Sequence, residues 1–248
     1  MDPLNEFLLH FGMRFSRLRG IIRPPADFMA AYKRNLEQLS RDQSEFHVFK
    51  DLQYDSGDHP ESYIDHECTF AAQQIAALRP KTILDVGSYR GFILGLLSHF
   101  DVTTVDVRSR QPISEKETVV TCDAKKLTFP GNTFDLVVSL CTVEHIGLGR
   151  YGDDFDPDGD KAAMREMIRV LKPGGHLIFS TNMTRAQPSI AYNAHRIYSH
   201  EMLRKRCEGL TPVEERVFSP SLGRFCNFDE VTTEPEVWNV YCGCWAKR

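Results

Sequence analysis

Acidic side chains recur where strands of a predicted sheet end. Asp85, Asp106 and Asp123 each end or follow an apolar segment that predicts a β-strand, and a fourth such segment ends shortly before Glu144. In open parallel sheets, ligands bind outside the carboxyl ends of the strands. Carboxylates placed there can accept hydrogen bonds from ribose hydroxyls, at Asp106, and from an adenine amino group, at Asp123. One aspartate at a strand end usually forms a turn or caps a helix, but four such features in chain order indicate a ligand site.

The loop after the first predicted strand carries two glycines. In TILDVGSYRGFIL (residues 82–94), Gly87 and Gly91 flank Tyr89. A nicotinamide or flavin dinucleotide needs G-x-G-x-x-G, so that backbone amides and a helix N-terminus can approach its pyrophosphate. The two glycines do not fit that spacing, which favours a ligand without a phosphate. We expect Asp85 to anchor the turn or to reach a ligand amino group through water, and Tyr89 to face solvent or the second substrate.

Strands and helices alternate from residue 61 onward. The apolar pattern predicts strands over residues 82–86, 102–107, 118–124, 134–141 and 176–181, with helices over 62–78, 91–100 and 160–171. Two late strands are predicted over 213–218 and 238–245. Such alternation is typical of an α/β fold with a doubly wound, mostly parallel sheet and right-handed crossovers.

The first 60 residues predict a helical cap on the domain formed by residues 61–248. Residues 1–20 carry one apolar helical stripe with Asp2 as the N-cap and Pro3 at the first helical position, and a second helix is expected over residues 26–39. The first helix, which ends in an arginine cluster, is expected to dock on its own domain or on a partner subunit. The alternative is an interfacial helix on anionic lipid at the inner face of a membrane.

Composition limits the function classes. The 248 residues are 42% apolar and carry a net charge of −4, which is ordinary for a soluble globular protein and argues against a nucleic-acid partner. No apolar run approaches the ~20 residues that span a bilayer. Seven dispersed cysteines predict reduced thiols in a cytoplasmic protein, and Cys242-x-Cys244 lacks a second pair at zinc-ligand spacing.

Five segments together resemble the Rossmann-like class of S-adenosylmethionine-dependent methyltransferases. They are ILDVGSYRG, VDV, CDA, FDLVVSLCTVEHI and RVLKPGGHLIFST, and they extend over residues 81–181. The resemblance implies a seven-stranded sheet whose last strand, near 238–245, is antiparallel. It also implies S-adenosylmethionine as cofactor and S-adenosylhomocysteine as product. The implied cofactor contacts are Asp85, Gly87, Ser88, Tyr89 and Gly91 in the first loop, Asp106 and Val107, Asp123 and Ala124, and Leu140 and Cys141.

A longer resemblance reaches the C-terminus. The segments VEHIGLGRYGDDFDPDGDKAAMREMIRVLKPGG, YNAHRIYS and NVYCGCWAKR are similar to a little-characterised methyltransferase-like family that is often associated with glycan biosynthesis. This resemblance implies O-methylation of a sugar hydroxyl in a surface glycan, or in its lipid- or nucleotide-linked precursor. The alternatives are methylation of another small molecule and a non-catalytic scaffold that binds the cofactor.

A hydroxyl acceptor requires a base, because an alcohol is scarcely ionised near pH 7. His145, after the fourth strand, is the predicted general base, and His195 is the second choice; alternatively, His145 only orders its loop or contacts the cofactor. The expected acceptor-binding residues are Glu144, Arg150, Tyr151, Asn193 and Arg196. Arg196 would bind a carboxylate or phosphate of the acceptor unless it forms a structural salt bridge. Tyr63, Asp65 and His66 are expected to close over the cofactor.

The acidic loop DDFDPDGD (residues 153–160) partly copies a calcium loop. Asp154, Asp156, Asp158 and Gly159 match its positions 1, 3, 5 and 6, but position 12 is Arg165 instead of glutamate. No metal site is therefore predicted. We expect a solvated loop whose acids favour the N-terminus of the next helix, with Asp160 as its cap.

Overall fold

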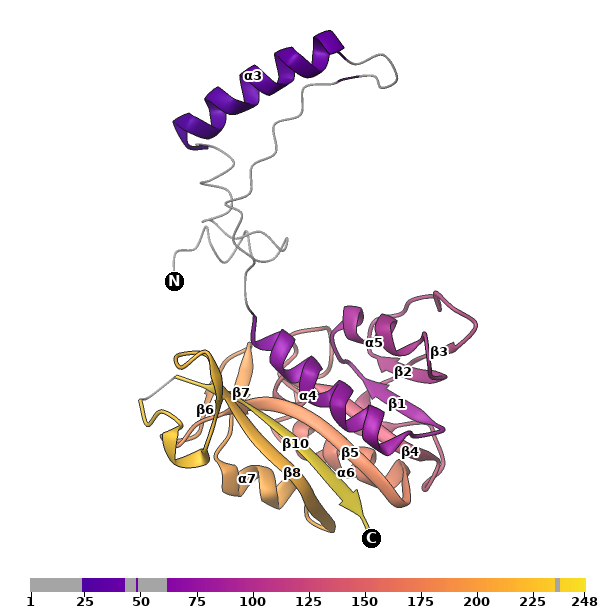
Figure 1. Ribbon diagram of the computed structural model, residues 1–248. Coiled ribbons are helices and arrows are strands. Elements are labelled where there is room, and N and C mark those ends of the chain that lie inside the picture. Colours follow the sequence, from indigo (N-terminus) through magenta and orange to yellow (C-terminus); the bar gives the residue numbers. More distant parts are fainter. Residues whose placement is uncertain (1–23, 43–47, 49–61, 235–236) are drawn as a thin grey trace. The chain divides into compact units, whose positions relative to one another are not determined.

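The computed structural model describes residues 24–42, 48, 62–234 and 237–248 (Figure 1). Contacts divide the chain into two units, Met1–Glu61 and Ser62–Arg248. In the first unit, helix α3 (Ala26–Asp42) forms where a helix is expected. The predicted helix over residues 1–20 lies outside the described residues, so its contact with lipid or a subunit stays a prediction. Within the described part of the chain, no helix is both long and apolar enough to cross a membrane.

The second unit contains a mixed eight-stranded sheet in the order β3-β2-β1-β4-β5-β10-β8-β9. The strands are β1 (Ile83–Val86), β2 (Val102–Asp106), β3 (Glu117–Thr121), β4 (Phe134–Leu140), β5 (Leu171–Met183), β8 (Leu210–Ser219), β9 (Arg224–Cys226) and β10 (Asn239–Lys247). Strands β1 to β5 are parallel, and β10 runs antiparallel between β5 and β8. The predicted doubly wound α/β fold is confirmed.

The predicted count of seven strands is one too low. After β8 the chain turns at Gly223, whose φ of +63° suits the glycine, and returns as β9 along Val217 to Ser219. A separate antiparallel hairpin joins β6 (Ser189–Ala191) to β7 (His195–Ile197). Three-residue strands such as these carry too little alternation to be recognised from sequence.

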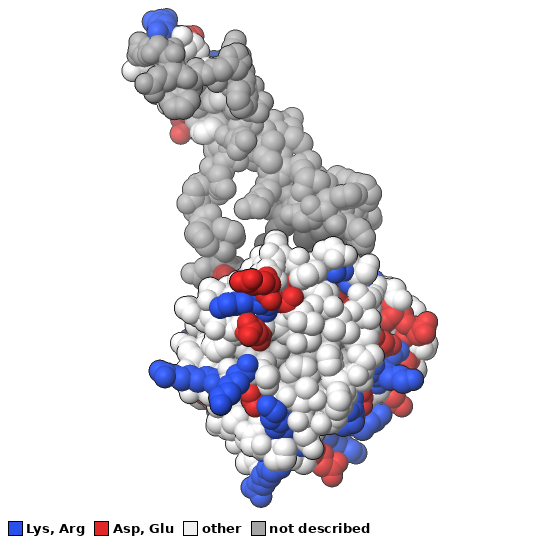
Figure 2. Space-filling view, turned by 90° about the vertical axis from the view of Figure 1, so that its right-hand side faces the viewer, with Lys and Arg blue, Asp and Glu red and all other residues white. Residues whose placement is uncertain are grey.

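Helices cover both faces of the sheet (Figure 1). Helices α4 (Tyr63–Leu78) and α5 (Arg90–Leu96) supply Phe70, Ala71, Ile75 and Ile93 to one apolar layer. On the other face, α6 (Gly159–Val170) buries Ala163, Met164, Met167 and Val170, and α7 (His200–Arg206) adds Leu203. Three short 3-10 helices complete the fold: η1 (Ala124–Lys126), η2 (Val143–His145) and η3 (Phe228–Glu230). In the face drawn in Figure 2, charged residues of both signs lie around a largely uncharged area.

The start of α4 corrects one expectation. Ser62 and Asp65 form a capping box, in which Asp65 accepts the Ser62 N–H at 3.0 Å. The His66 ring stacks on Phe218 with its centroid 3.9 Å away. Asp65 therefore caps the helix and His66 packs on the sheet, while the Tyr63 ring contacts Trp238.

The strand order places the site. Strand β1 lies between β2 and β4, so the chain crosses the sheet between β3 and β4. The carboxyl ends of β1 and β4 are consequently adjacent and diverge into different connections, which is where ligands bind in open α/β sheets.

Candidate functional site

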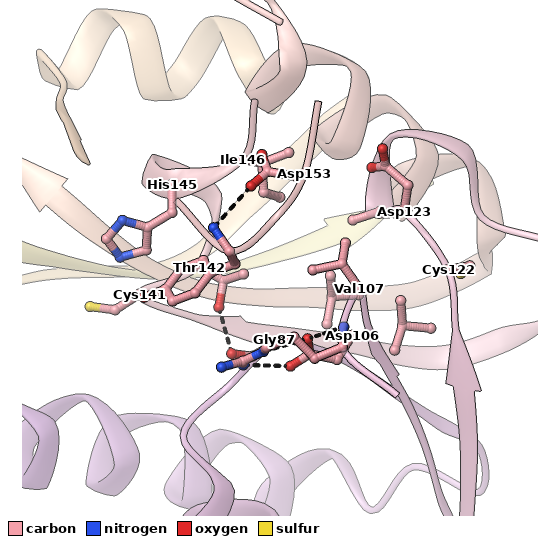
Figure 3. A pocket seen from close by; sticks show the side chains of 15 residues that line it. Gly87, Asp106, Val107, Cys122, Asp123, Cys141, Thr142, His145, Ile146 and Asp153 are labelled. Carbon is pink, nitrogen blue, oxygen red and sulfur yellow. Dashed lines mark hydrogen bonds and ion pairs between the residues drawn. The ribbon is translucent and has the colours of Figure 1, made fainter. Parts of the chain in front are cut away.

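A pocket lies outside the carboxyl ends of β1, β2 and β4 (Figure 3). It holds about 680 Å³ of space, its open mouth included. Its lining residues are Val86, Gly87, Val105, Asp106, Val107, Arg108, Cys122, Asp123, Ala124, Cys141, Thr142, His145, Ile146, Tyr151 and Asp153. Six of the predicted cofactor contacts are among them: Gly87, Asp106, Val107, Asp123, Ala124 and Cys141.

Gly87 brings backbone into the pocket wall. Its φ is +68°, and a Cβ there would lie 2.6 Å from Cγ2 of Thr142. The Thr142 hydroxyl donates to the Gly87 carbonyl at 2.9 Å, which ties the β1 loop to the end of β4. Only glycine fits this conformation and this approach without strain.

The other predicted residues of the loop support the pocket without lining it. Asp85 is buried and accepts the Ser88 N–H at 3.2 Å, and the Ser88 hydroxyl accepts the Leu140 N–H at 3.0 Å. Burial raises the pKa of Asp85 to about 7, although the hydrogen bonds from Ser88 oppose this shift. Tyr89 is 55% exposed, and its ring covers Gly91, where a Cβ would be 2.7 Å from Tyr89 Cε1.

Asp106 ends β2 and is held by an arginine that sequence analysis missed. Arg108 donates hydrogen bonds to the Asp106 carboxylate from Nε at 2.9 Å and from Nη2 at 2.7 Å. Burial alone would raise the pKa of Asp106, but the hydrogen bonds from Arg108 hold that pKa below its usual value. The carboxylate stays ionised at neutral pH and keeps lone pairs for further donors.

Asp123 also has a structural partner. Its Oδ1 accepts the Lys125 N–H at 2.8 Å and so caps η1. The capping role and a ligand contact are compatible, because a carboxylate has about four acceptor positions. Apolar lining atoms from Cys122, Ala124 and Ile146 lie in the same pocket.

His145 lies at the end of η2 and lines the pocket. Its Nδ1 is 2.5 Å from the carbonyl oxygen of Ala194. Because a carbonyl only accepts, Nδ1 carries the proton in this contact and Nε2 is left with a free lone pair. Burial lowers the pKa of His145 to about 4, so the ring is neutral at physiological pH.

A series of ring contacts leads from His145 to aromatic side chains from other parts of the chain. The acceptor cluster, as we name it, consists of Tyr63, His145, Tyr151, His195 and Trp238. The His145 ring centroid is 5.6 Å from Tyr151 and 6.3 Å from His195. Trp238 in turn lies 6.2 Å from His195 and 5.4 Å from Tyr63. The two predicted bases thus lie together, and Trp238 is a neighbour that sequence analysis did not assign.

Two buried carboxyl groups lie beside the cluster. Glu67 accepts from the Cys141 thiol at 2.8 Å and from the Ser180 hydroxyl at 2.5 Å. Glu144 accepts from the Thr181 hydroxyl at 2.9 Å. Burial raises the pKa of both, that of Glu144 to about 8. Sequence analysis missed Glu67, although its spacing from Ile64 and Ala71 places it on the apolar face of α4.

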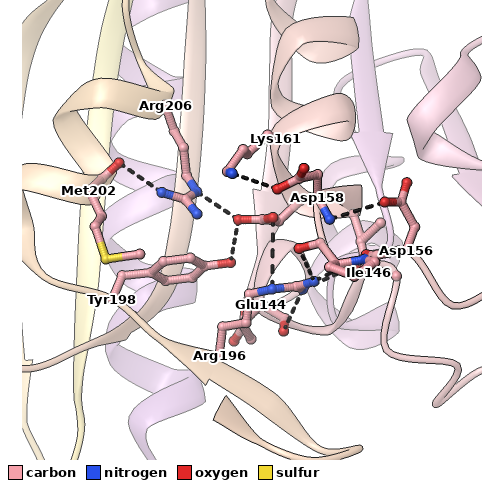
Figure 4. Close-up of polar contacts among 12 residues, drawn as sticks. Glu144, Ile146, Asp156, Asp158, Lys161, Arg196, Tyr198, Met202 and Arg206 are labelled. Carbon is pink, nitrogen blue, oxygen red and sulfur yellow. Dashed lines mark hydrogen bonds and ion pairs between the residues drawn. The ribbon is translucent and has the colours of Figure 1, made fainter. Parts of the chain in front are cut away.

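The predicted acceptor contacts of Glu144 and Arg196 do not hold (Figure 4). Glu144 is 1% exposed, and Arg196 is 4% exposed. The Arg196 guanidinium donates to the carbonyls of Ile146 at 2.7 Å and Pro157 at 3.2 Å, and its Nε lies 3.7 Å from Asp160. Both side chains therefore hold the loop after β4 and are out of reach of an acceptor.

Three other predicted residues are exposed near the cluster. Arg150 donates to the Ala194 carbonyl at 3.2 Å, and Tyr151 lines the pocket. Asn193, in the β6–β7 hairpin, is exposed. These three side chains are accessible from solvent.

The acidic loop has partners of its own. Asp153 accepts the Gly147 N–H at 2.6 Å, and Asp158 pairs with Lys161 at 2.5 Å. The predicted cap by Asp160 is wrong: α6 begins after Asp158, and buried Asp160 instead binds Arg206 at 2.6 Å and Tyr198 at 3.1 Å. In the described part of the chain, no three His, Cys, Asp or Glu side chains are arranged to hold a metal ion.

Comparisons with known proteins give information about the fold of this chain. A family model described as "Caenorhabditis protein of unknown function, DUF268" matches residues 103–214. No curated protein sequence matches the chain.

Among solved structures, the Burkholderia thailandensis 1,6-didemethyltoxoflavin-N1-methyltransferase, crystallised with 1,6-didemethyltoxoflavin and S-adenosylhomocysteine, is similar with a TM-score of 0.56. It has 18% identity over 90% of this chain and 86% of that chain. A Galdieria sulphuraria protein described as a sarcosine dimethylglycine methyltransferase gives 0.53, with 13% identity over 75% and 91% of the two chains. The [4+2]-cyclase SpnF gives 0.51, with 17% identity over 72% and 80%. At these identities the similarity establishes a shared α/β fold.

Proposed function

We propose that this chain is an S-adenosylmethionine-dependent methyltransferase that methylates a hydroxyl group with His145 as the general base. One observation carries the proposal: the pocket with Gly87, Asp106 and Asp123 at three strand ends also contains His145, whose Nε2 has no hydrogen-bond partner among the described residues. Because the same fold also occurs in a [4+2]-cyclase, the proposal rests on these residues more than on the fold.

The residues of the pocket fit the cofactor. Asp106 would accept from the ribose hydroxyls and Asp123 from the adenine amino group, while Ala124, Val107 and Ile146 supply apolar contact for the adenine ring. The glycine at position 87 permits close backbone approach by the methionine part. When bound, the cofactor supplies an electrophilic methyl group on a sulfonium.

A dinucleotide fits less well. Its pyrophosphate would have to approach the N-terminus of α5, where the ring of Tyr89 covers Gly91. S-adenosylmethionine carries no phosphate, so this ring is no obstacle to it. Its S-adenosylhomocysteine product is bound in one of the similar structures.

His145 would take the proton of the acceptor hydroxyl. The Ala194 carbonyl holds Nδ1 in its protonated form, which directs the basic lone pair to Nε2. The low pKa of His145 makes it a modest base, but it is neutral and ready to accept at every pH above about 5. The acceptor must lie in line with the transferred methyl group, and the walls of the acceptor cluster would hold it there.

A sugar is the acceptor that the cluster fits best. The rings of Tyr63, Tyr151 and Trp238 can pack against the apolar C–H face of a sugar ring, and the imidazoles can exchange hydrogen bonds with its hydroxyls. The motif similarity to a glycan-associated family points to the same acceptor class.

The test has two parts. Calorimetry with S-adenosylhomocysteine and NAD on wild type and Asp106→Ala measures cofactor choice; we expect the first ligand to bind wild type only, and tighter binding of NAD would overturn the cofactor. Turnover of sugar acceptors is then compared for wild type, His145→Ala and His195→Ala. If His145→Ala turned over an acceptor at the wild-type rate, the assignment of His145 as the general base would be wrong.

A further inference from the structure

Arg150 is a cation without an acidic partner at the edge of the acceptor cluster. Its side chain is exposed, and no ion pair involves it in the described part of the chain, whereas Arg108 pairs with Asp106 and Arg196 with Asp160. Its guanidinium carbon lies 5.4 Å from the ring centroid of Tyr151. This contact orients the fork and leaves its charge unneutralised by protein.

The position of Arg150 is tied to that of the proposed base. The Ala194 carbonyl oxygen accepts both His145 Nδ1–H and an Nη1 hydrogen of Arg150 at 3.2 Å. The guanidinium and the imidazole are therefore close neighbours. The remaining Nη1 hydrogen, both Nη2 hydrogens and the Nε hydrogen of Arg150 have no protein partner among the described residues.

Asp153, a carboxylate of the same loop, forms no ion pair with Arg150 in the described part of the chain. Both oxygens of Asp153 accept backbone N–H groups, from Gly147 and from Tyr151. His145 and His195 are neutral, since burial lowers the pKa of each and the charge of Arg150 lowers it further. Beside a neutral base, the guanidinium of Arg150 therefore has no competing ion pair and remains available to an anion.

We propose that Arg150 is an anion subsite of the acceptor site, and that the acceptor sugar carries a phosphate or carboxylate group near the hydroxyl that is methylated. A guanidinium binds either group bidentately through its fork. This inference rests on the proposed methyl transfer, and it gives Arg150 the role that sequence analysis gave to Arg196.

A direct test needs no turnover. The full chain is titrated with inorganic phosphate, with acetate and with chloride at constant ionic strength, while the ring resonances of His145 are followed by NMR at pH 7. We expect saturable shifts with phosphate or acetate in wild type, weaker ones in Arg150→Lys and none in Arg150→Gln. Arg165→Gln, which removes an exposed arginine of α6, serves as the control and should behave as wild type.

Sugar ligands then identify the anion. Glucose 6-phosphate, glucuronate and glucose are titrated into wild type and Arg150→Gln. We expect at least one anionic sugar to bind wild type about tenfold more tightly than glucose, a difference of about 1.4 kcal/mol that Arg150→Gln abolishes. The tighter of the two anionic sugars identifies phosphate or carboxylate as the group recognised.

The failures of the two proposals are distinguishable. If wild type and Arg150→Gln respond equally to all anions, and thermal unfolding shows that both are folded, the subsite is overturned. The methyltransferase proposal still stands in that case if S-adenosylhomocysteine binds. An anion response that depends on Arg150, without binding of S-adenosylhomocysteine, would overturn the methyltransferase proposal and leave the subsite standing.

Discussion

Replacing Gly87 with alanine should damage the pocket wall in a way that a second substitution repairs. The new Cβ would lie 2.6 Å from Thr142 Cγ2, well inside normal contact distance. Thr142 would have to rotate, and its hydrogen bond to the Gly87 carbonyl would be lost. Thr142→Ser removes only the methyl group and keeps the hydroxyl.

The expected cost follows from two effects. A left-handed conformation costs alanine about 1–2 kcal/mol, and the lost hydrogen bond costs about 1 kcal/mol. Gly87→Ala should therefore reduce the free energy of unfolding by about 2–3 kcal/mol. Thr142→Ser alone should cost about 0.8 kcal/mol for the missing methyl group. In the double variant the steric conflict is relieved. Its loss in the free energy of unfolding should therefore be about 1 kcal/mol smaller than the sum of the losses of the two single variants.

Thermal unfolding and calorimetry with S-adenosylhomocysteine measure these effects. At about 2–4 °C per kcal/mol, Gly87→Ala should lower the midpoint by about 4–12 °C. Gly95→Ala is the matched control: it lies in α5 with nothing within 4 Å of an added Cβ, and should be neutral or stabilise by about 0.5–1 kcal/mol. Strict additivity of Gly87→Ala and Thr142→Ser would refute the contact, and an unchanged midpoint in Gly87→Ala would refute the strain.

Three further outcomes are expected. If His145 is the base, kcat/KM should be constant from pH 5 to pH 8 and should fall tenfold per pH unit only below about pH 4, where the imidazole becomes protonated. A fall in kcat/KM with a midpoint near pH 6.5 would contradict the lowered pKa of His145. Glu117→Gln should cost about 3–5 kcal/mol in urea unfolding, because the buried carboxylate takes two hydrogen bonds from Arg90, and a loss below 1 kcal/mol would refute this. Lys172 and nearby hydrogen bonds lower the pKa of Asp135 to about 2. The stabilisation of the fold by this carboxylate is therefore present above pH 4, is lost as the pH falls toward 2, and should reach about 1 kcal/mol after solvent screening. Asp135→Asn should flatten this part of the curve of unfolding free energy against pH.

The residues of the proposed cofactor site could be selected by sequence analysis because they lie at strand ends. Asp106 ends its strand, and Gly87 and Asp123 follow theirs within two residues; parallel strands bring such positions to one edge. What could not be predicted there are the partners that side chains choose after folding. The grip of Arg108 on Asp106 is one example, and the cover of Tyr89 over Gly91 is another.

The surroundings of the proposed acceptor site were predicted less well, since their contacts join residues far apart in the chain. His145 meets Ala194 across 49 positions, and Trp238 joins Tyr63 from the other end of the domain. Periodicity carries no information on such pairs. Arg196 illustrates the error: its fork suggested an acceptor anion, but four backbone carbonyls and a carboxylate surround it.

One buried carboxylate joins the elements around the proposed acceptor site. Asp160 pairs with Arg196 from the hairpin and with Arg206 from α7, and it accepts the Tyr198 hydroxyl (Figure 4). Two guanidinium ions in an apolar surrounding are stable only with such a counter-charge and with carbonyl acceptors for the remaining hydrogens. Because Arg196 also holds the carbonyls of the loop after β4, that loop and the hairpin with Ala194 form one body. The direction of His145 Nε2 is therefore fixed by contacts that involve neither Asp106 nor Asp123.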